Sequence, residues 1–573
     1  MFAARSGAWR PVTVQEFASR VASVAAGLIA AGIRPGDRIA LLAGTSLEWA
    51  VCDFAIWAAG AVTVPVYETS SVQQIGWELG DSGAVAAFAE DARLAEAIRL
   101  AQAPKVEAVW RLDDGGLDVL SRAGRHVAAA DVAQRRDAVT SATLATIVYT
   151  SGTTGRPKGC MISHGNVTAA VRAITAVPGV QERVLAGDAS SLIFLPLSHI
   201  LARVVALCLV HAGKRIGYLA DPGELPAELP AFGPTILLAV PRVFEKVVAA
   251  ARHQAEAEGH QDLFRAAEAT AIAYSRAADR SAVRRAAMWR LRLRHAVYDR
   301  LVYARLRAAL GGHLAWAISG GAPLNGDLLH LLRGAGIPVL EGWGLTETVG
   351  PVTMNPPAVQ RVGSVGLPLP GCTVRIAQDG EVLVRGPTVF QGYWQDPQAT
   401  AEALDGPWLR TGDLGRLDGA GFVYLTGRKK ELLITAGGKN VAPAALEDRV
   451  REHWLIAECV VVGDRRPYVA ALVTLDGAAF ARWKQRQGKP PQATVGDLRT
   501  DPDLLAEVQQ AVDRANTAVS RAEGIKRFRI LDASFTIGEE LTLLEKVRRS
   551  YVLDKYAGDV QALYGPSDPF AAR

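Results

Sequence analysis

The sequence predicts an α/β protein with a large N-terminal domain of layered, mostly parallel sheets and helices and a smaller α+β C-terminal domain. Two observations support this prediction. Glycine-punctuated apolar runs alternate with alanine-rich helical patterns, and 573 residues are too many for a single hydrophobic core. Because the carboxyl ends of parallel strands meet at one edge of a sheet, we expect ligand groups near Thr150 and Ser319. The runs expected as strands are 38–42, 61–66, 84–89, 146–149, 191–194, 235–239, 315–319 and 339–342.

The later elements predict a separate C-terminal module. A short hairpin is expected at 373–384 and a late strand at 422–425. We place the domain boundary before Gly427, which gives an N-terminal domain of 1–426 and a C-terminal domain of 427–573. In the C-terminal domain, strands are expected at 457–462 and 468–475 and a helix at 503–519.

The composition is that of an ordinary globular protein, with 49% hydrophobic and 21% charged residues. The net charge of +5 is small for this length, which argues against nucleic-acid binding. The five cysteines are scattered without metal-ligand or redox spacing, as expected in a reducing cytosol. The N-terminus lacks the apolar segment of a signal peptide, and Pro196, His199, Arg203 and His211 interrupt the most apolar stretch, 192–212. We therefore expect a cytoplasmic protein without a membrane span.

A loop rich in glycine and hydroxyl side chains follows the expected strand 146–149. Glycines let backbone N–H groups approach an anion closely, hydroxyls add donors, and Lys158 adds a compact positive charge. This combination suits a polyphosphate, although its spacing differs from that of the common P-loop. A flexible linker is the alternative interpretation. The candidate phosphate-binding residues are Thr150, Ser151, Gly152, Thr153, Thr154, Gly155 and Lys158.

Four further motifs follow in order: 319–324 (SGGAPL), 341–348 (EGWGLTET), 411–413 (TGD) and 427–431 (GRKKE). Together with the loop, they make the chain resemble the adenylate-forming superfamily of acyl-CoA synthetases, luciferases and peptide-synthetase adenylation domains. The likeness runs from about Pro11 to about Tyr556 and is strongest to bacterial long-chain fatty acid–CoA ligases. It implies that a carboxylate attacks the α-phosphate of ATP, and that the thiol of coenzyme A then displaces AMP from the acyl-adenylate.

The resemblance also implies which residues hold ATP. Glu347 would bind Mg²⁺, with Thr346 near the α-phosphate, because hard cations prefer carboxylate oxygens. Asp413 would accept hydrogen bonds from two ribose hydroxyls, and Arg428 would support the ribose. The residues that would border the adenine or the adjacent acyl chain are Gly321, Ala322, Pro323, Gly342, Trp343 and Gly344, although a core-packing role is equally compatible with Trp343.

His199, in the segment 195–199 (LPLSH), matches the family histidine that borders the acyl pocket and the reacting carboxylate. Taken alone, a histidine in an apolar run is more often a core residue. Arg203 stands four residues later, where some long-chain members have an aromatic gate, and this departure argues against aromatic gating of the acyl tunnel.

The resemblance implies that the C-terminal domain supplies different residues for the two steps, formation of the acyl-adenylate and transfer to coenzyme A. Lys546 stands at the position of the adenylation lysine, able to reach the attacking carboxylate and the α-phosphate. Glu545 beside it departs from the family pattern, as do Leu543 and Leu544, and a neighbouring carboxylate would raise the pKa of the lysine or draw its side chain away. Gly438 and Lys439 match the loop that serves the coenzyme A step after the mobile C-terminal domain rotates about residues 428–429.

One basic segment lies outside these motifs. The span 284–310 has a helical pattern with eight arginines and a single acid, Asp299. Such a helix suits an anionic membrane surface and thereby a fatty substrate, whereas a buried face beneath solvated arginines is the alternative favoured by periodicity alone. The residues expected to line one face are Met288, Leu291, His295, Tyr298, Val302 and Leu306.

We therefore expect a cytoplasmic, ATP-dependent fatty acyl-CoA synthetase that uses a fatty acid, Mg²⁺ and coenzyme A and binds no nucleic acid. Peripheral contact with an anionic membrane at the inner surface stays an open hypothesis. One alternative is an acyl-AMP ligase that loads a carrier protein. The other is a non-catalytic acyl- or nucleotide-binding homologue, suggested by the altered residues around Lys546. No motif fixes the acyl chain length or the oligomeric state.

Overall fold

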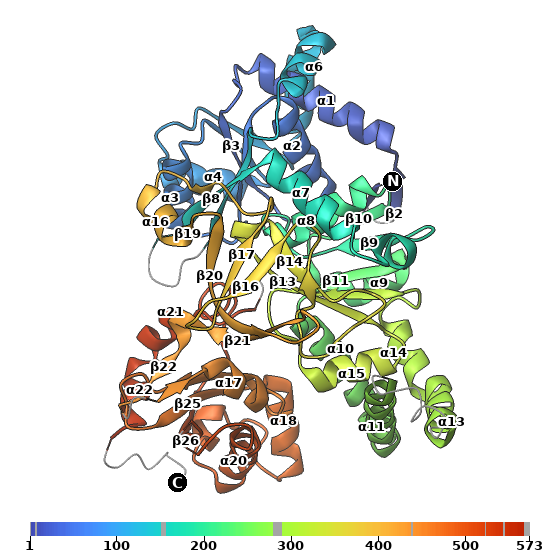
Figure 1. Ribbon diagram of the computed structural model, residues 1–573, viewed down its shortest axis with the longest axis vertical. Helices are drawn as coiled ribbons and strands as arrows, with labels where there is room; N and C mark the ends of the chain where they lie inside the picture. Colours follow the sequence, from blue (N-terminus) through green and yellow to red (C-terminus); the bar gives the residue numbers. More distant parts are fainter. Residues whose placement is uncertain are drawn as a thin grey trace. The chain divides into compact units, whose positions relative to one another are not determined.

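The computed structural model describes residues 2–5, 9–150, 156–278, 289–436, 439–521, 523–542 and 545–565 (Figure 1). The expected α/β class is confirmed, because helices alternate with strands that pair mostly in parallel in the two large sheets. The chain forms two compact units. The first comprises Met1–Arg375, Leu383–Thr411 and Leu417–Tyr424, and the second comprises Ile376–Val382, Gly412–Arg416 and Leu425–Arg573.

A seven-stranded sheet of the first unit has the order β18 (Gly392–Tyr393), β8 (Lys158–Ser163), β7 (Leu144–Thr150), β4 (Val62–Val66), β3 (Arg38–Leu42), β5 (Ala86–Ala89) and β6 (Ala108–Arg111). The strands from β7 to β6 are parallel, and they include the first four runs expected as strands. β8 returns antiparallel to β7, which makes Thr150 and Lys158 register partners at the end of this hairpin where the connecting loop begins and ends. One face of the sheet packs against α3 (Val72–Ser82) and α4 (Ala92–Ala101).

A nine-stranded sheet has the order β15 (Leu367–Pro368), β14 (Gly350–Met354), β13 (Val339–Leu345), β12 (Trp316–Ser319), β11 (Ile236–Ala239), β9 (Ser190–Ile193), β10 (Arg215–Tyr218), β1 (Phe2–Arg5) and β2 (Trp9–Val12). The strands from β13 to β1 are parallel. β14 is antiparallel to β13, with a bulge between Trp343 and Gly344. The carboxyl ends of β9, β12 and β13 therefore lie along one edge.

The helices of the first unit begin largely at capping residues. Thr13 and Ser163 each accept a hydrogen bond from the backbone three residues later, and Glu16 and Asn166 return one, so that α1 and α7 start with capping boxes. The helices not yet given are α1 (Val14–Ala30), α2 (Leu47–Ala58), α5 (Gly116–Ala123), α6 (Ala129–Asp137), α7 (His164–Thr175), α8 (Ile200–His211), α9 (Leu225–Phe232), α10 (Pro241–Ala257), α11 (Gln261–Ala278), α13 (Trp289–Tyr298), α14 (Ala304–Ala309), α15 (Gly326–Gly334) and α16 (Pro397–Ala403). Across the described residues, no helix combines the length and the apolar character needed to cross a membrane.

A buried ion pair ties α2 to α8. The guanidinium of Arg203 bonds both carboxylate oxygens of Asp53, and the two side chains are 3% and 2% exposed. Arg203 also donates to the Thr146 hydroxyl at 2.9 Å. Its guanidinium carbon lies 5.4 Å from the ring centroid of Trp49 and 5.1 Å from that of Trp57. Arg203, the residue expected to argue against an aromatic gate, therefore belongs to a packed polar cluster.

A five-stranded sheet contains β16 (Thr373–Ile376), β17 (Glu381–Arg385), β20 (Trp408–Leu417) and β19 (Leu404–Asp405), with β21 (Val423–Arg428) on β20. The second unit holds the pair β22 (Leu433–Ile434) and β23 (Asn440–Val441), and a sheet of β24 (Ile456–Val462), β25 (Val469–Leu475) and β26 (Ile525–Ile530). α17 (Pro443–Arg451), α18 (Gly477–Arg486) and α20 (Pro502–Asn516) pack on one face of that sheet, and α21 (Arg549–Lys555) packs on the other. α19 (Val495–Leu498) and α22 (Ala557–Ala562) are short.

Candidate active site

Three predicted segments emerge from one edge of the nine-stranded sheet. The segment 195–199 follows β9, Ser319 to Pro323 follow β12, and the residues from Gly342 to Glu347 lie at the end of β13. Because these strands are parallel, the topology gathers segments that are far apart in the sequence. A Cβ on Gly320 would come within 3.0 Å of Leu201, which places the β12 loop beside the start of α8.

His199 is the N-cap of α8. The side-chain Nδ1 accepts a hydrogen bond of 3.2 Å from the backbone N–H of Leu201, and the backbone N–H of His199 donates to the Pro196 carbonyl at 3.0 Å. The preceding turn is held by Thr45, whose hydroxyl donates to the Leu195 carbonyl at 2.8 Å. The imidazole is thus fixed at a helix N-terminus, where the backbone presents a partial positive charge. Such a position suits an approaching carboxylate.

Glu347 lies beside the phosphate-loop hairpin, although the two are remote in sequence. The hydroxyl of Tyr393 donates to Glu347 Oε1 at 2.8 Å, and Lys158 Nζ lies 5.3 Å from the centroid of the same ring. β18 brings Tyr393 there by pairing with Cys160 on β8. Thr150 hydrogen-bonds to the Cys160 thiol, whose pKa is raised by burial and by the charge of Glu347. Thr150, Lys158, Glu347 and Tyr393 form what we call the carboxylate–lysine cluster.

The predicted residues Ser151, Gly152, Thr153, Thr154 and Gly155 lie outside the described residues. The described residues on each side of this loop are held in place. Thr150 pairs with Lys158 in the β7–β8 ladder, and Trp77 contacts both residues on the other side. The indole N–H of Trp77 donates to the Pro157 carbonyl at 2.9 Å, and the guanidinium of Arg156 lies 4.7 Å from the Trp77 ring centroid. The loop is therefore attached between two fixed strand ends that carry Thr150 and Lys158.

The segments predicted to border adenine differ in exposure. Gly321, Ala322 and Pro323 are exposed, whereas Trp343 is buried, with 9% of its surface accessible. Gly344 allows the bulge in β13, since a Cβ there would lie 1.9 Å from the carbonyl oxygen of Gly350. Gly342 and Thr346 flank this bulge and are half-buried.

Glu341, in the same strand, is a buried acid that sequence reasoning did not single out. Its carboxylate accepts a hydrogen bond from the backbone of Leu324, and burial raises its pKa to about 8. Its register partner on β12 is Ser319. A neutral carboxyl here ties the β12 loop to β13.

In the second unit, Asp413 and Arg428 form an ion pair with an Nε–Oδ1 distance of 3.0 Å. Lys546 keeps an exposed surface, but its ammonium group is surrounded closely enough to interact electrostatically with both residues and with Glu431. Desolvation by the surrounding protein, followed by the charge of Arg428, lowers the pKa of Lys546 to about 8. This lowering of the Lys546 pKa is opposite to the increase that the neighbouring carboxylate of Glu545 was expected to cause.

The backbone explains how Lys546 is presented. Glu545 has a left-handed φ of 54°, and Lys546 exchanges hydrogen bonds with Thr542, whose hydroxyl accepts from the Lys546 N–H at 3.1 Å. The altered neighbours Leu543 and Leu544 lie outside the described residues, as does Gly438 of the predicted coenzyme A loop. Lys439 is exposed, and its Nζ lies 3.2 Å from Glu523 Oε1.

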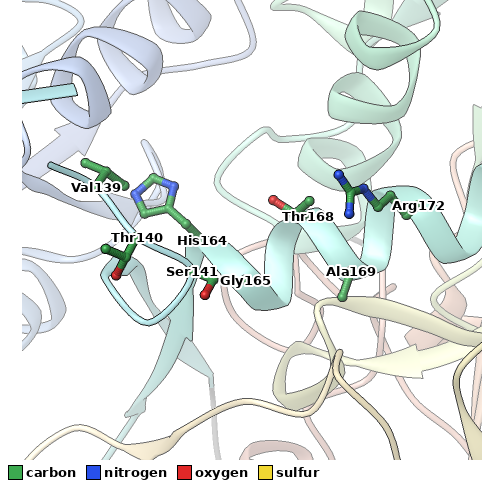
Figure 2. Close-up of a pocket in the computed structure, with 8 residues that line it drawn as sticks. All are labelled: Val139, Thr140, Ser141, His164, Gly165, Thr168, Ala169 and Arg172. Carbon is green, nitrogen blue, oxygen red and sulfur yellow. The ribbon is translucent and has the colours of Figure 1, made fainter. Parts of the chain in front are cut away.

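A surface pocket lies at the opposite end of the β7–β8 hairpin from Thr150 and Lys158 (Figure 2). Burial and the charge of Arg203 lower the pKa of His164 to about 4, so this histidine is neutral near neutral pH. None of the predicted site residues lines the pocket, and we assign it no part in the chemistry. Its lining residues are Val139, Thr140, Ser141, His164, Gly165, Thr168, Ala169 and Arg172.

Comparison with protein families decides the assignment. The model described as "AMP-binding enzyme" matches residues 2–394, and the model described as "AMP-binding enzyme C-terminal domain" matches residues 430–568. The chain belongs to the AMP-binding enzyme family. The resemblance inferred from the motifs is thereby confirmed.

Among relatives of this AMP-binding enzyme is the long-chain-fatty-acid–CoA ligase FadD15 of Mycobacterium tuberculosis, 47% identical over 97% of this chain and 93% of the relative. A long-chain-fatty-acid–CoA ligase of Xenopus laevis, ACSBG2, is 28% identical over 97% of this chain and 80% of its own length. Of the solved structures, ATP-bound MatB from Rhodopseudomonas palustris aligns with a TM-score of 0.71, at 24% identity over 97% of this chain and 95% of that one. This similarity shows the shared fold.

Proposed function

We propose that this AMP-binding enzyme is an ATP-dependent fatty acid–CoA ligase acting on long-chain acids. It would convert the acid to an acyl-adenylate with release of pyrophosphate, and then to the coenzyme A thioester with release of AMP. The observation that carries the proposal is 47% identity over 97% of the chain to a long-chain-fatty-acid–CoA ligase. The carboxylate–lysine cluster supports it, since a cation and hydroxyl groups lie beside a carboxylate at the end of a glycine-rich hairpin.

The proposed chemistry assigns electrostatic tasks to residues of the first unit. Lys158 and the Thr150 hydroxyl would hold phosphate oxygens at the mouth of the loop. His199 would border the reacting carboxylate, and Thr346 would lie near the α-phosphate. These groups offset the repulsion between an anionic acid and a polyanionic nucleotide, which is the main barrier to their approach.

The residues also fit a magnesium ion carried by ATP. Across the described residues, no group of three or more acidic, histidine or cysteine side chains is placed to hold a metal. Mg²⁺ is commonly bound through one or two carboxylates together with substrate phosphates and water, so Glu347 would suffice as the protein ligand. When bound, the ion would neutralise phosphate charge. Tyr393 would orient the Glu347 carboxylate, because burial and the charge of Glu347 hold the phenol pKa far above its usual value.

Glu347→Gln is expected to lower kcat/KM for ATP by roughly one to two orders of magnitude, with partial recovery at high Mg²⁺. The amide keeps the shape of the carboxylate but loses the charge that a hard cation prefers. Initial rates measured across a Mg²⁺ series test this. Tyr393→Phe is the matched control, since it removes the hydroxyl at 2.8 Å and keeps the carboxylate. An unchanged Mg²⁺ dependence in folded Glu347→Gln would remove Glu347 from the metal site.

Adenylation is expected to decline as the pH rises through about 8. A lysine is charged below its pKa, and the pKa of Lys546 is lowered from 10.5 to about 8, so its positive charge is lost in this range. If the charge acts in the first half-reaction, the rate should fall about tenfold per pH unit above the pKa. Lys546→Arg should remove this alkaline limb. If the adenylation rate of Lys546→Arg still falls above pH about 8 as in the wild type, a titrating group other than Lys546 causes the decline.

The acceptor and the partners are also part of the proposal. Fatty acid, ATP and coenzyme A are the proposed substrates, the cytoplasm is the proposed location, and an anionic membrane is a proposed peripheral contact. The test is to supply carboxylic acids from acetate to stearate and identify the products by mass spectrometry. Formation of long-chain acyl-CoA supports the proposal, whereas release of acyl-adenylate that is unaffected by coenzyme A would favour the carrier-loading alternative.

A further inference from the structure

α13 presents two apolar faces, and only one of them is packed. Its inner face carries Leu291, His295 and Tyr298, which are half-buried. The His295 ring stacks on that of Tyr274 in α11 with a centroid distance of 4.0 Å, and its Nε2 lies 2.6 Å from the Gly334 carbonyl. Figure 1 shows α13 beside α11 at the periphery of the first unit. The rotation of the helix is therefore fixed, and its outer face is a defined surface.

The outer face is also apolar. Trp289 is 61% exposed, Leu293 is 62% exposed and Val297 is 49% exposed. Because an α-helix turns by about 100° per residue, the spacing of four places these side chains in one stripe within about 80° of each other. Leu301, in the following turn, is 48% exposed. Scattered single apolar residues on a surface need no explanation, but a contiguous stripe headed by tryptophan marks a contact with another apolar phase.

Arginines border this stripe on both sides. On the same spacing, Arg292 falls on one side and Arg290 and Arg294 on the other. These three side chains and that of Arg300 are exposed, and none of the four lies within ion-pair distance of a carboxylate in the described part of the chain. The single acid of the segment, Asp299, is engaged by Arg307 with a shortest N–O distance of 2.7 Å. The charge of Arg290, Arg292 and Arg294 along the stripe is thus uncompensated, whereas the charge of Arg300 contributes to lowering the pKa of Asp299.

We propose that the outer face of α13, defined by Trp289, Leu293 and Val297 with Arg290, Arg292 and Arg294, docks on the surface of an anionic lipid bilayer. The apolar stripe would enter the boundary between head groups and acyl chains, and the arginines would contact lipid phosphates. The long aliphatic part of an arginine side chain lets its guanidinium reach lipid phosphates while the apolar stripe is buried. Tryptophan is enriched at the boundary between head groups and acyl chains, because its ring is apolar and its N–H is polar. This proposal names the surface for the peripheral membrane contact proposed above. Its geometry does not depend on the ligase chemistry, and only the benefit to a membrane-dissolved fatty substrate rests on that proposed function.

The test is flotation of the full chain with phosphatidylcholine vesicles that contain or lack phosphatidylglycerol, without ATP or coenzyme A. The wild type should bind the anionic vesicles, and binding should weaken as salt rises. Arg290→Gln, Arg292→Gln and Arg294→Gln combined should lower the partition coefficient about fivefold per arginine, on the order of a hundredfold in total. Leu293→Ser with Val297→Ser should lower it by about tenfold or more.

Matched controls separate this surface from bulk charge and bulk hydrophobicity. Arg34→Gln, Arg122→Gln and Arg125→Gln remove the same charge from other exposed positions. Leu100→Ser with Val119→Ser removes residues that are 51% and 48% exposed on α4 and α5. Both controls should bind vesicles like the wild type, and all variants should keep wild-type acyl-CoA formation from a short, soluble acid.

Three results would overturn the proposal. The first is that the wild type binds vesicles with and without phosphatidylglycerol equally well, and the second is that the control variants lose as much binding as the α13 variants. The third is that Leu293→Ser with Val297→Ser changes the self-association of the protein, measured by sedimentation velocity without lipid. The last result would assign the stripe to contact with a second copy of the chain. Because flotation requires no turnover, loss of the docking proposal leaves the ligase proposal intact, and absence of ligase activity leaves a positive flotation result standing.

Discussion

Lys546→Ala should lose about two to three orders of magnitude in the rate of acyl-adenylate formation, while thioester formation from supplied acyl-AMP stays close to that of the wild type. The lysine lies among Arg428, Asp413 and Glu431. The proposed function assigns it to the first half-reaction, as the resemblance of its motif implies. Removing a charge aimed at the transition state affects only the step in which that charge develops. The two half-reactions should therefore separate in one variant.

The measurement is pyrophosphate exchange into ATP for the first half-reaction and release of AMP from acyl-AMP and coenzyme A for the second. Glu545→Gln is the matched control, because it removes the adjacent carboxylate and keeps the lysine. Adenylation within a few-fold of wild type in Lys546→Ala would show that another cation performs the role. Equal loss of both half-reactions would instead indicate a folding defect.

Asp53→Ala should lower the free energy of unfolding of the first unit by about 3–5 kcal/mol, because it leaves the buried guanidinium of Arg203 without its carboxylate. Arg203 is 3% exposed, so water cannot solvate the orphaned charge. The remaining contacts, to Thr146 and two tryptophan rings, are neutral. Urea denaturation followed by tryptophan fluorescence measures the change.

The double variant Asp53→Leu with Arg203→Met should recover much of the lost stability, since it removes both charges and keeps apolar volume. Glu48→Gln breaks an exposed pair with Arg20, whose side chains are 40% and 37% accessible, and should cost about 1 kcal/mol or less. A cost of that small size for Asp53→Ala would mean that water reaches the cluster.

Eight of the sixteen strands that the structure describes in the two large sheets could be predicted from sequence, because they are largely continuous apolar runs, as at 38–42 and 235–239. β8 and β14 are among the eight that were not expected. The first begins with Lys158 and Gly159, and the second with Gly350 and Pro351, so neither has a strong local preference for a strand. Both form because a neighbouring strand supplies the hydrogen-bonding partners.

Residues of the candidate site could be proposed from sequence only where chemically active side chains are concentrated in short motifs. Glu347 was inferred from its motif, but its partner Tyr393 lies 46 residues later and carries no local signal. Only the pairing of β18 with β8 brings that tyrosine to Lys158. Glu341 was missed for a related reason, because burial and not residue type makes its carboxyl unusual. The apolar stripe on α13 was hidden because periodicity reveals two apolar faces without showing which is packed.

The central claim is that this chain activates a long-chain fatty acid through an adenylate and transfers it to coenzyme A. It is tested most directly by adding palmitate to the purified protein with ATP and Mg²⁺. The account predicts palmitate-dependent exchange of pyrophosphate into ATP without coenzyme A, and multiple turnovers of AMP and palmitoyl-CoA once coenzyme A is added. Absence of exchange with palmitate and with shorter and longer acids, in a folded protein that binds ATP, would contradict it.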